Sequence, residues 1–182
     1  IRYLLLLSVI LLIASNFIVT NGFKNLSAQT QSYKGKSDTS VVLRDGDIVF
    51  QSSFSGQSKA IQLATHSKFS HCGILFREGN QWYVYEAVQP VKKTSFEKWI
   101  RHGDNSAYKI MRLKNAQEVL TASVLTKLKS ETTKHLDKDY DLTFEWSDTR
   151  IYCSELVWKA YKNSTQLDIG ALQQLKEFDL TH

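Results

Sequence analysis

Proline, cysteine and glycine are all scarce in this chain: its 182 residues contain one proline, two cysteines and eight glycines. A single proline, together with the lack of internal repeats, argues against a long linker or a second domain. The sequence has no cysteine and histidine spacing typical of a metal site, and no glycine-rich loop that would cradle a phosphate. Since 42% of the residues are hydrophobic, one ordinary globular core can form. We therefore expect a single domain that uses neither a metal ion nor a cofactor.

An excess of one charge sign is also missing, since the formal net charge is only +5. Removal of residues 1–28 would take away the bases Arg2 and Lys24 and no acidic residue, which leaves a smaller surplus. Basic residues that are spread along a chain indicate a solvated surface and not a stripe for nucleic acid. We expect no nucleic-acid partner.

One long apolar run is present, at residues 3–13, directly after a basic residue. This arrangement is typical of a secretory signal, and we predict a signal peptide over residues 1–28, cut after Ser15 or Ala28. Polar residues without periodicity follow, and they predict a disordered leader over residues 29–40. No cysteine follows the run closely, which argues against a lipoprotein. We expect an exported protein, periplasmic or extracellular, that associates with the cell envelope; an uncleaved membrane anchor is the alternative.

Hydrophobic periodicity over residues 41–182 predicts a part that contains all the strands, between residues 45 and 113, and helices alone from residue 115 on. We predict strands at residues 48–50, 70–76, 82–88 and 108–113. We predict helices at residues 55–68, 94–100 and 115–134, and a last one that begins at residue 153. This order is typical of an α+β layered fold and not of a doubly wound sheet.

The most informative segment is residues 152–161, Tyr-Cys-Ser-Glu-Leu-Val-Trp-Lys-Ala-Tyr. Apolar residues recur at helical spacing behind Cys153, which predicts a buried helix that begins there. The unpaired N–H groups and the dipole at a helix start favour an anion, so a thiol at this point is biased toward the reactive thiolate. Cys153 is therefore a candidate nucleophile.

A partner for this cysteine is predicted in the hairpin between the second and third strands. A tight loop centred on Glu78 and Gly79 places His71 directly opposite Glu86, and a slip by two residues would keep both on one face. Glu86 can then fix the tautomer and orientation of the imidazole. Cysteine, histidine and an orienting carboxylate form the three-part arrangement of an activated nucleophile.

The second cysteine, Cys72, directly follows this histidine. Two cysteines in an exported protein raise the alternative of a structural disulfide between Cys72 and Cys153. Successive strand side chains point to opposite faces, so His71 and Cys72 should not both face the same site. We expect Cys72 to be buried and inert, and Cys153 to be partly accessible and reactive.

Five motifs lie in a fixed order along the domain. They are Leu-Arg-Asp-Gly-Asp-Ile-Val-Phe at 43–50, Phe-Ser-His-Cys-Gly-Ile at 69–74, Tyr-Glu-Ala at 85–87, Tyr-Asp-Leu-Thr-Phe at 140–144 and Tyr-Cys-Ser-Glu-Leu-Val at 152–157. This ordered set resembles the YiiX-like group, the circularly permuted branch of the NlpC-type papain-like cysteine hydrolases. The resemblance implies a permuted papain-like α+β fold over residues 41–182, with an antiparallel sheet or small barrel packed against helices. It also implies that the histidine strand precedes the cysteine helix.

The resemblance further implies the roles of individual residues. Cys153 resembles the nucleophile, His71 the general base and Glu86 the third polar residue. Tyr140 matches a tyrosine near the substrate, where it serves as an oxyanion or substrate contact. Cys72 stands where a branched aliphatic residue is expected, which fits a position facing the core.

Together, the residues and the resemblance predict an exported thiol protease or amidase. We expect it to cleave an amide bond in cell-wall peptides or small acyl-amides through a thioester, without a metal. One alternative is a thiol acyltransferase or esterase that acts on a lipid-like substrate. The other is a non-catalytic binding module whose cysteines are disulfide-bonded.

Overall fold

The computed structural model describes residues 3–5, 32–33, 42–174 and 177–178. Most of the predicted signal peptide and leader therefore lies outside the described residues, and both stay predictions. The short strands β1 (Tyr3–Leu5) and β10 (Leu172–Gln174) pair with each other in antiparallel fashion. Among the described residues, no helix combines the length and apolar character needed to cross a membrane.

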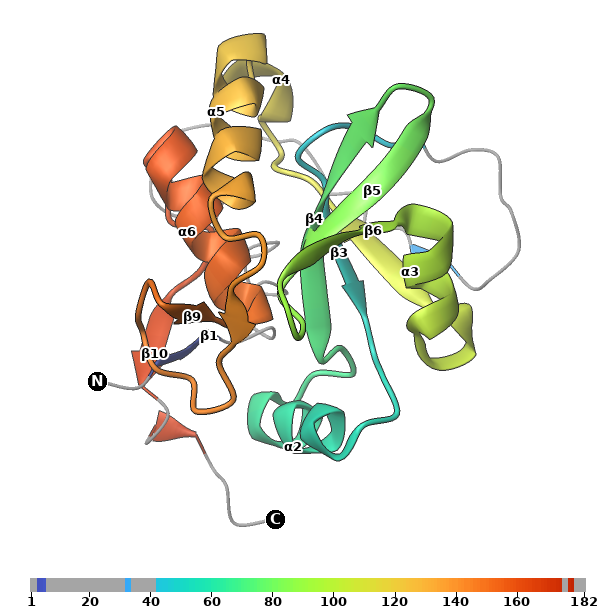
Figure 1. Cartoon of the computed structure of the whole chain (residues 1–182), viewed down its shortest axis with the longest axis vertical. Coiled ribbons are helices and arrows are strands. Elements are labelled where there is room, and N and C mark those ends of the chain that lie inside the picture. Colours follow the sequence, from blue (N-terminus) through green and yellow to red (C-terminus); the bar gives the residue numbers. More distant parts are fainter. Residues whose placement is uncertain (1–2, 6–31, 34–41, 175–176, 179–182) are drawn as a thin grey trace.

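One six-stranded sheet forms the centre of the domain, and every neighbouring pair in it is antiparallel (Figure 1). Its order is β2-β7-β3-β4-β5-β6. The strands are β2 (Ser32–Tyr33), β3 (Ile48–Gln51), β4 (His71–Glu78), β5 (Gln81–Glu86), β6 (Lys92–Ser95) and β7 (Tyr108–Met111). The predicted strands at 48–50, 70–76, 82–88 and 108–113 are confirmed within two residues at their ends.

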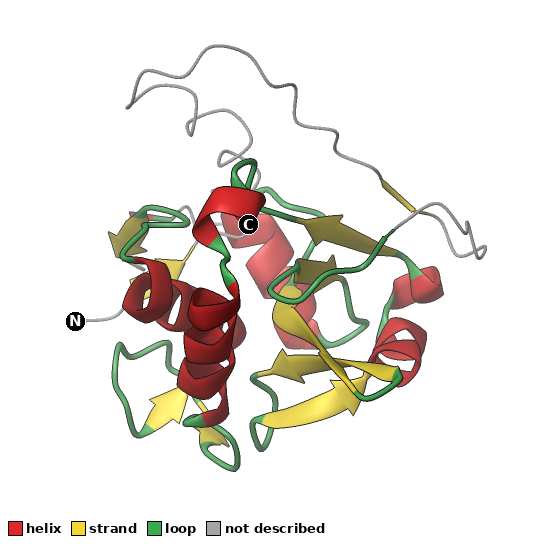
Figure 2. Cartoon of the chain, turned by 90° about the horizontal axis from the view of Figure 1, so that it is seen from above, coloured by secondary structure: helices red, strands yellow, loops and turns green. Residues whose placement is uncertain are grey.

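Helices cover both faces of this sheet (Figure 2). Figure 1 shows α5 (Ala122–Thr133) and α6 (Cys153–Thr165) against one face, and α3 (Phe96–His102) against the other. The strand residues alternate accordingly, since Ile74 belongs to the core cluster with α6 and Leu75 to the cluster with Trp99 of α3. The helix α2 (Gly56–Thr65) lies beyond the end of the sheet at which β4 begins. The structure therefore confirms an α+β fold with an antiparallel sheet packed against helices.

The predicted single helix over residues 115–134 is wrong, because the chain forms two helices there. The first, α4 (Ala116–Val119), ends at Leu120, whose φ of −89° and ψ of 60° are not helical. Thr121 then starts α5, since its side-chain oxygen accepts a hydrogen bond from the Val124 N–H at 3.4 Å. The periodicity of the apolar residues continues across this break in the backbone, so periodicity alone does not reveal it. The sign of a second helix start is the capping residue Thr121.

Six short strands were not predicted: β1, β2, β6, β10, β8 (Asp139–Tyr140) and β9 (Arg150–Ile151). The last two pair in parallel, and together they carry the chain from α5 to the start of α6. Strands as short as these leave little period that could be read in a sequence. Two of these strands nevertheless matter for the site, because β8 contains Tyr140 and β9 ends two residues before Cys153.

The turn Asp45-Gly46-Asp47 fixes the start of β3 against the rest of the domain. Asp47 is completely buried, and its two carboxylate oxygens accept hydrogen bonds from Arg112 at 2.6 and 2.7 Å. The Gly46 carbonyl accepts a hydrogen bond from the Tyr161 hydroxyl, which joins the turn to α6. A bidentate pair of this kind holds one geometry, so the turn sets the distance between the sheet and the cysteine helix.

Replacing Arg112 should test how strongly the domain depends on this ion pair. We expect Arg112→Met to lower the free energy of unfolding by about 3 kcal/mol, because it leaves the buried Asp47 carboxylate without its partner. Urea denaturation followed by circular dichroism measures the change. In the matched control, Asp47→Asn combined with Arg112→Met should recover part of the loss. A change below about 0.5 kcal/mol in Arg112→Met would show that the pair is unimportant.

Candidate active site

The helix α6 begins at Cys153, as predicted. Tyr152 precedes it in an extended conformation, and Glu155 reaches back to the Tyr152 N–H at 3.5 Å to close the first turn. Behind the cysteine, a completely buried face confirms the predicted helix: Leu156, Val157, Ala160 and Tyr161. The sulfur of Cys153 thus lies beside N–H groups that the helix itself leaves unused, where a thiolate is favoured over a thiol.

His71 and Glu86 lie on the same face and are bonded to each other. The distance from His71 Nε2 to Glu86 Oε2 is 2.6 Å. The strand register places Glu86 opposite Gly73, so the expected direct opposition of His71 and Glu86 is wrong by two residues. The parity of the prediction was nevertheless right, and the two residues meet as diagonal neighbours.

Gly73 makes this diagonal contact feasible. A Cβ at position 73 would lie 2.5 Å from Val84 Cγ1 and 3.4 Å from Glu86 Cβ. A side chain there would collide with β5 and would stand between the strand backbone and the carboxylate. The absence of a side chain at Gly73 leaves room for Glu86 to reach along the sheet to His71.

The second ring nitrogen of His71, Nδ1, is available to Cys153. Because Nε2 is bonded to Glu86, Nδ1 is the nitrogen available to the hydrogen bond that joins His71 and Cys153. Burial alone would lower the pKa of His71, but the hydrogen bonds to Cys153 and Glu86 raise it to about 10. Hydrogen bonds from Cys72 and His71 outweigh burial at Cys153 and hold its pKa well below the usual range. The site is thus set up as a thiolate beside an imidazolium.

Glu86 remains ionised in this environment. Burial would raise its pKa, but the hydrogen bond and charge of His71, together with a hydrogen bond from Thr94, lower it instead. Thr94, on β6, donates from Oγ1 to Glu86 Oε1 at 2.6 Å. On the other side, the completely buried Trp99 lies with its ring centre 6.3 Å from that of His71. Thr94 therefore fixes the carboxylate of the His71–Glu86 pair, and Trp99 lies beside its largely buried imidazole.

Cys72 departs from its predicted role in one respect. It is completely buried, as expected, but its side chain is hydrogen-bonded to Cys153, so it does not point away from the site. Strand parity does separate Cys72, which packs under α6, from the ring of His71, which lies near Trp99. His71 is, however, the first residue of β4, where the sheet ends and the two faces are no longer separated. One sulfur, that of Cys153, can therefore contact both residues.

The exposure of Cys153 also differs from the prediction. We expected this thiol to be partly accessible, but only 3% of the residue is exposed. Its neighbours from two strands account for this: Cys72 and His71 of β4, and Tyr140 of β8. A substrate would have to approach the small part of the sulfur that these side chains leave open.

Tyr140 is brought to the cysteine, in agreement with its predicted place near the substrate. Its hydroxyl is hydrogen-bonded to Cys153 and accepts a hydrogen bond from Gln57 Nε2 of α2 at 3.5 Å. Burial, together with the negative charge and hydrogen bond of Cys153, raises the pKa of Tyr140 well above its usual range, so the hydroxyl keeps its proton and can donate. Gln57 and Thr94 were missed in the sequence, where isolated polar residues in a helix and a short strand give no signal.

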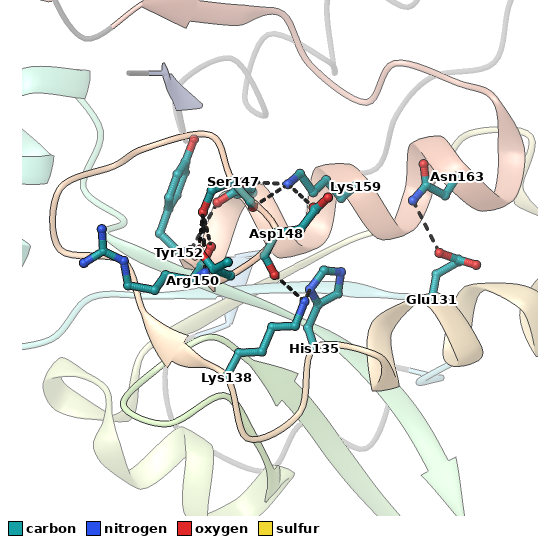
Figure 3. Close-up of polar contacts among 11 residues, drawn as sticks. Glu131, His135, Lys138, Ser147, Asp148, Arg150, Tyr152, Lys159 and Asn163 are labelled. Atoms are coloured by element: carbon teal, nitrogen blue, oxygen red, sulfur yellow. Dashed lines mark hydrogen bonds and ion pairs between the residues drawn. The ribbon is translucent and has the colours of Figure 1, made fainter. Parts of the chain in front are cut away.

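A polar network behind the site fixes the segment that joins Tyr140 to Cys153. Figure 3 shows Lys159 of α6 extended toward Ser147 and Asp148, and its Nζ lies 2.7 Å from the Ser147 carbonyl and 2.8 Å from Asp148 Oδ1. Lys138 donates to the Asp148 carbonyl from the other side at 2.5 Å. Burial and the charges of the two lysines lower the pKa of His135, which lies beside Lys138, to about 4. These contacts hold the loop on α6, and so they position Tyr140 relative to the cysteine.

Comparison with known proteins shows which proteins this chain is similar to. The family model described as "Permuted papain-like amidase enzyme, YaeF/YiiX, C92 family" matches residues 42–182. A protein of Escherichia coli K12, "Uncharacterized protein YiiX", is 48% identical over 136 residues, which are 75% of this chain and 66% of that protein. This chain thus spans slightly less than two thirds of that relative. A crystal structure described as the metalloprotein yiiX of Escherichia coli O157:H7 shares 47% identity and covers 76% of each chain, with a TM-score of 0.72.

Because that relative is described as a metalloprotein, the side chains of this site have to be compared with the needs of a metal ion. Among the described residues, no group of three or more histidine, cysteine, aspartate or glutamate side chains is arranged to hold one. The side chains of the site are bonded to one another instead, as the 2.6 Å contact between His71 and Glu86 shows. The residues that the structure describes at this site do not fit a metal centre.

The pH dependence of Cys153 alkylation should report the ion pair. In the native protein we expect the rate with iodoacetamide to change little between about pH 6 and 9, since Cys153 is already a thiolate there. In His71→Ala the rate should instead climb with pH over this range, because the thiol has lost the charge and hydrogen bond of the imidazolium that help to lower its pKa. Mass spectrometry of the labelled cysteine gives the rates.

The controls separate the two thiols. Cys153→Ala, which retains Cys72, should be labelled only after unfolding, because Cys72 is completely buried. A native rate that climbs through pH 8 to 9 as it does in His71→Ala would contradict the thiolate–imidazolium pair.

Proposed function

The chain belongs to the C92 family of permuted papain-like amidases, and we propose that it is a cysteine hydrolase that cleaves an amide bond through a thioester on Cys153. The observation that carries this proposal is the pair of contacts made by one imidazole. His71 is hydrogen-bonded to Cys153 and, through Nε2, to Glu86 at 2.6 Å. Such a constellation activates a thiol for attack on a carbonyl.

In the first half of the reaction, the Cys153 thiolate attacks the amide carbonyl. The oxygen becomes negatively charged, and two donors lie near the sulfur: the backbone N–H of Cys153 at the helix start and the hydroxyl of Tyr140. The His71 imidazolium then gives its proton to the leaving amine, and the C–N bond breaks. The products of this half are a free amine and a thioester on Cys153.

In the second half, the neutral His71 removes a proton from water, which attacks the thioester. The C–S bond breaks, the acid is released, and the thiolate and imidazolium are restored. Glu86 orients the ring and stabilises its positive charge throughout. Thr94 donates to the second oxygen of Glu86 and thus keeps the carboxylate turned toward His71.

For the substrate, we propose peptides of the cell wall or small acyl-amides that the protein meets after export. The support for export is the apolar run at residues 3–13. A second candidate is a thiol acyltransferase or esterase for lipid-like substrates. It is favoured by two exposed side chains, Phe54 and Leu142, which lie close in sequence to Gln57 and Tyr140 at the site. Apolar groups of this kind suit a substrate with a hydrocarbon chain.

A panel of chromogenic amides and esters tests the proposed function. We expect native protein to release the amine from at least one acyl-amide, and to form a thioester whose mass maps to Cys153. Cys153→Ala should retain the melting temperature and lose turnover by at least about a thousandfold. Faster cleavage of long-chain esters than of amides would favour the lipid-directed candidate. Turnover that survives in Cys153→Ala would overturn both.

The role of Glu86 is tested by a conservative substitution. Glu86→Gln should lower kcat by about a hundredfold with little change in melting temperature, since the amide fills the same space but stabilises the imidazolium poorly. Thr94→Val should lower kcat by only about threefold to tenfold, because it removes one hydrogen bond of about 1 kcal/mol, and Thr94→Ser should restore it.

Rates and melting temperatures are measured on the same preparations. If Glu86→Gln melts at a much lower temperature and yet keeps full activity per folded molecule, then Glu86 is a structural carboxylate and the site is a dyad of Cys153 and His71.

A further inference from the structure

The two cysteines of the chain meet at the site although they come from different parts of the sequence. Cys72 lies near the start of β4 and Cys153 at the start of α6, and their side chains are hydrogen-bonded to each other. Both thiols are free, and both belong to the same buried cluster between the sheet and α6. The sulfur of Cys153 is therefore in contact with a second sulfur that the proposed hydrolysis does not consume.

The two thiols differ in ionisation. The contacts of Cys153 with Cys72 and His71 hold its pKa well below the usual range. Burial, together with the negative charge of Cys153, raises the pKa of Cys72 well above it. One sulfur is thus a nucleophile near neutral pH, and its neighbour is a protonated thiol that donates to it.

We propose that Cys72 is a resolving cysteine, which forms a reversible disulfide with Cys153 after a hydroperoxide has oxidised the nucleophile. The disulfide switches the hydrolase off, because it consumes the attacking sulfur, and it protects Cys153 from further oxidation. The proposal rests on the reactivity of Cys153 that the proposed function also requires.

The reaction is a two-electron oxidation of the two thiols by one molecule of hydrogen peroxide. The Cys153 thiolate attacks one oxygen of hydrogen peroxide, the O–O bond breaks, and the leaving hydroxide takes a proton to become water. Cys153 is then a sulfenic acid. The Cys72 sulfur gives up its proton and attacks the Cys153 sulfur, the S–O bond breaks, and the hydroxide leaves as a second water. In total, two thiols and one peroxide give one disulfide and two waters.

The arrangement of the backbone suits this reaction. The sulfurs have to move from hydrogen-bond contact to a bond of about 2 Å. Cys72 is the second residue of β4 and Cys153 the first residue of α6, so each thiol lies at the end of its element, on the side where the two elements meet. Without a neighbouring thiol, a sulfenic acid proceeds to sulfinic and sulfonic acids, which thiol reagents do not reduce.

Treatment with hydrogen peroxide followed by peptide mapping tests the proposal, and it requires no substrate. Cleavage after lysine and arginine places Cys72 in the peptide 69–77 and Cys153 in the peptide 151–159. In native protein we expect these two peptides to appear cross-linked without reductant, with the intact chain lighter by two hydrogen atoms. Dithiothreitol should restore both the separate peptides and at least about nine tenths of the thiol content.

The variant Cys72→Ala supplies the matched comparison, with each protein scored against its own untreated sample. Its Cys153 should gain two or three oxygen atoms, and dithiothreitol should not reverse the change. A second control, Cys153→Ala, should leave Cys72 unoxidised under the same treatment. Melting temperatures show whether each variant is folded, and the mapping of native protein does not depend on them.

Three results would overturn the proposal. They are a native Cys153 that collects oxygen atoms while Cys72 remains a thiol, a disulfide that joins two chains, and a Cys72→Ala variant that dithiothreitol restores as well as native protein. If the cross-linked peptides form while every amide and ester of the panel is left uncleaved, the proposed function fails and the resolving role of Cys72 stands.

Discussion

A buried group of three charges determines how this site is built. The thiolate of Cys153, the imidazolium of His71 and the carboxylate of Glu86 carry one more negative charge than positive, in a region nearly closed to water. Removing such charges from water is costly unless each has close partners. The domain supplies these partners from separate elements. Thr94 donates a hydrogen bond to Glu86. The Cys153 sulfur has beside it the unused N–H groups of the first turn of α6 and the hydroxyl of Tyr140, which donates to it.

This requirement explains why the register of the sheet is so tightly specified. The carboxylate reaches His71 only as a diagonal neighbour, and this path exists because position 73 is a glycine. A shift of the hairpin by one residue would turn Glu86 to the opposite face. The position of α6 over the sheet depends on two further contacts. Arg112 holds the turn at Asp47 through a bidentate pair, and the Tyr161 hydroxyl of α6 donates to the Gly46 carbonyl of the same turn. The geometry of the proposed catalytic site thus depends on contacts far from the sulfur.

The elements with clear periodicity could be predicted from the sequence. The apolar face of α6 showed that Cys153 lies at the start of a buried helix. Strand parity placed His71 and Glu86 on one face of the sheet, although it did not show that they are diagonal neighbours. What could not be predicted depends on the ends of elements. Thr121 breaks an apparently continuous helix, and the position of His71 at the end of β4 lets Cys72 and His71 meet one sulfur. Gln57 and Thr94 were missed because a single polar residue acquires its partner only through tertiary folding.

The position of Trp99 beside the imidazole of His71 has an optical consequence. The indole is completely buried, and its ring centre lies 6.3 Å from that of His71. A protonated imidazole quenches the emission of a nearby indole by accepting an electron from its excited state, and a neutral imidazole does so far less. The emission of Trp99 therefore depends on whether His71 carries its proton, and the fold contains its own fluorescent indicator of the charge state of the site.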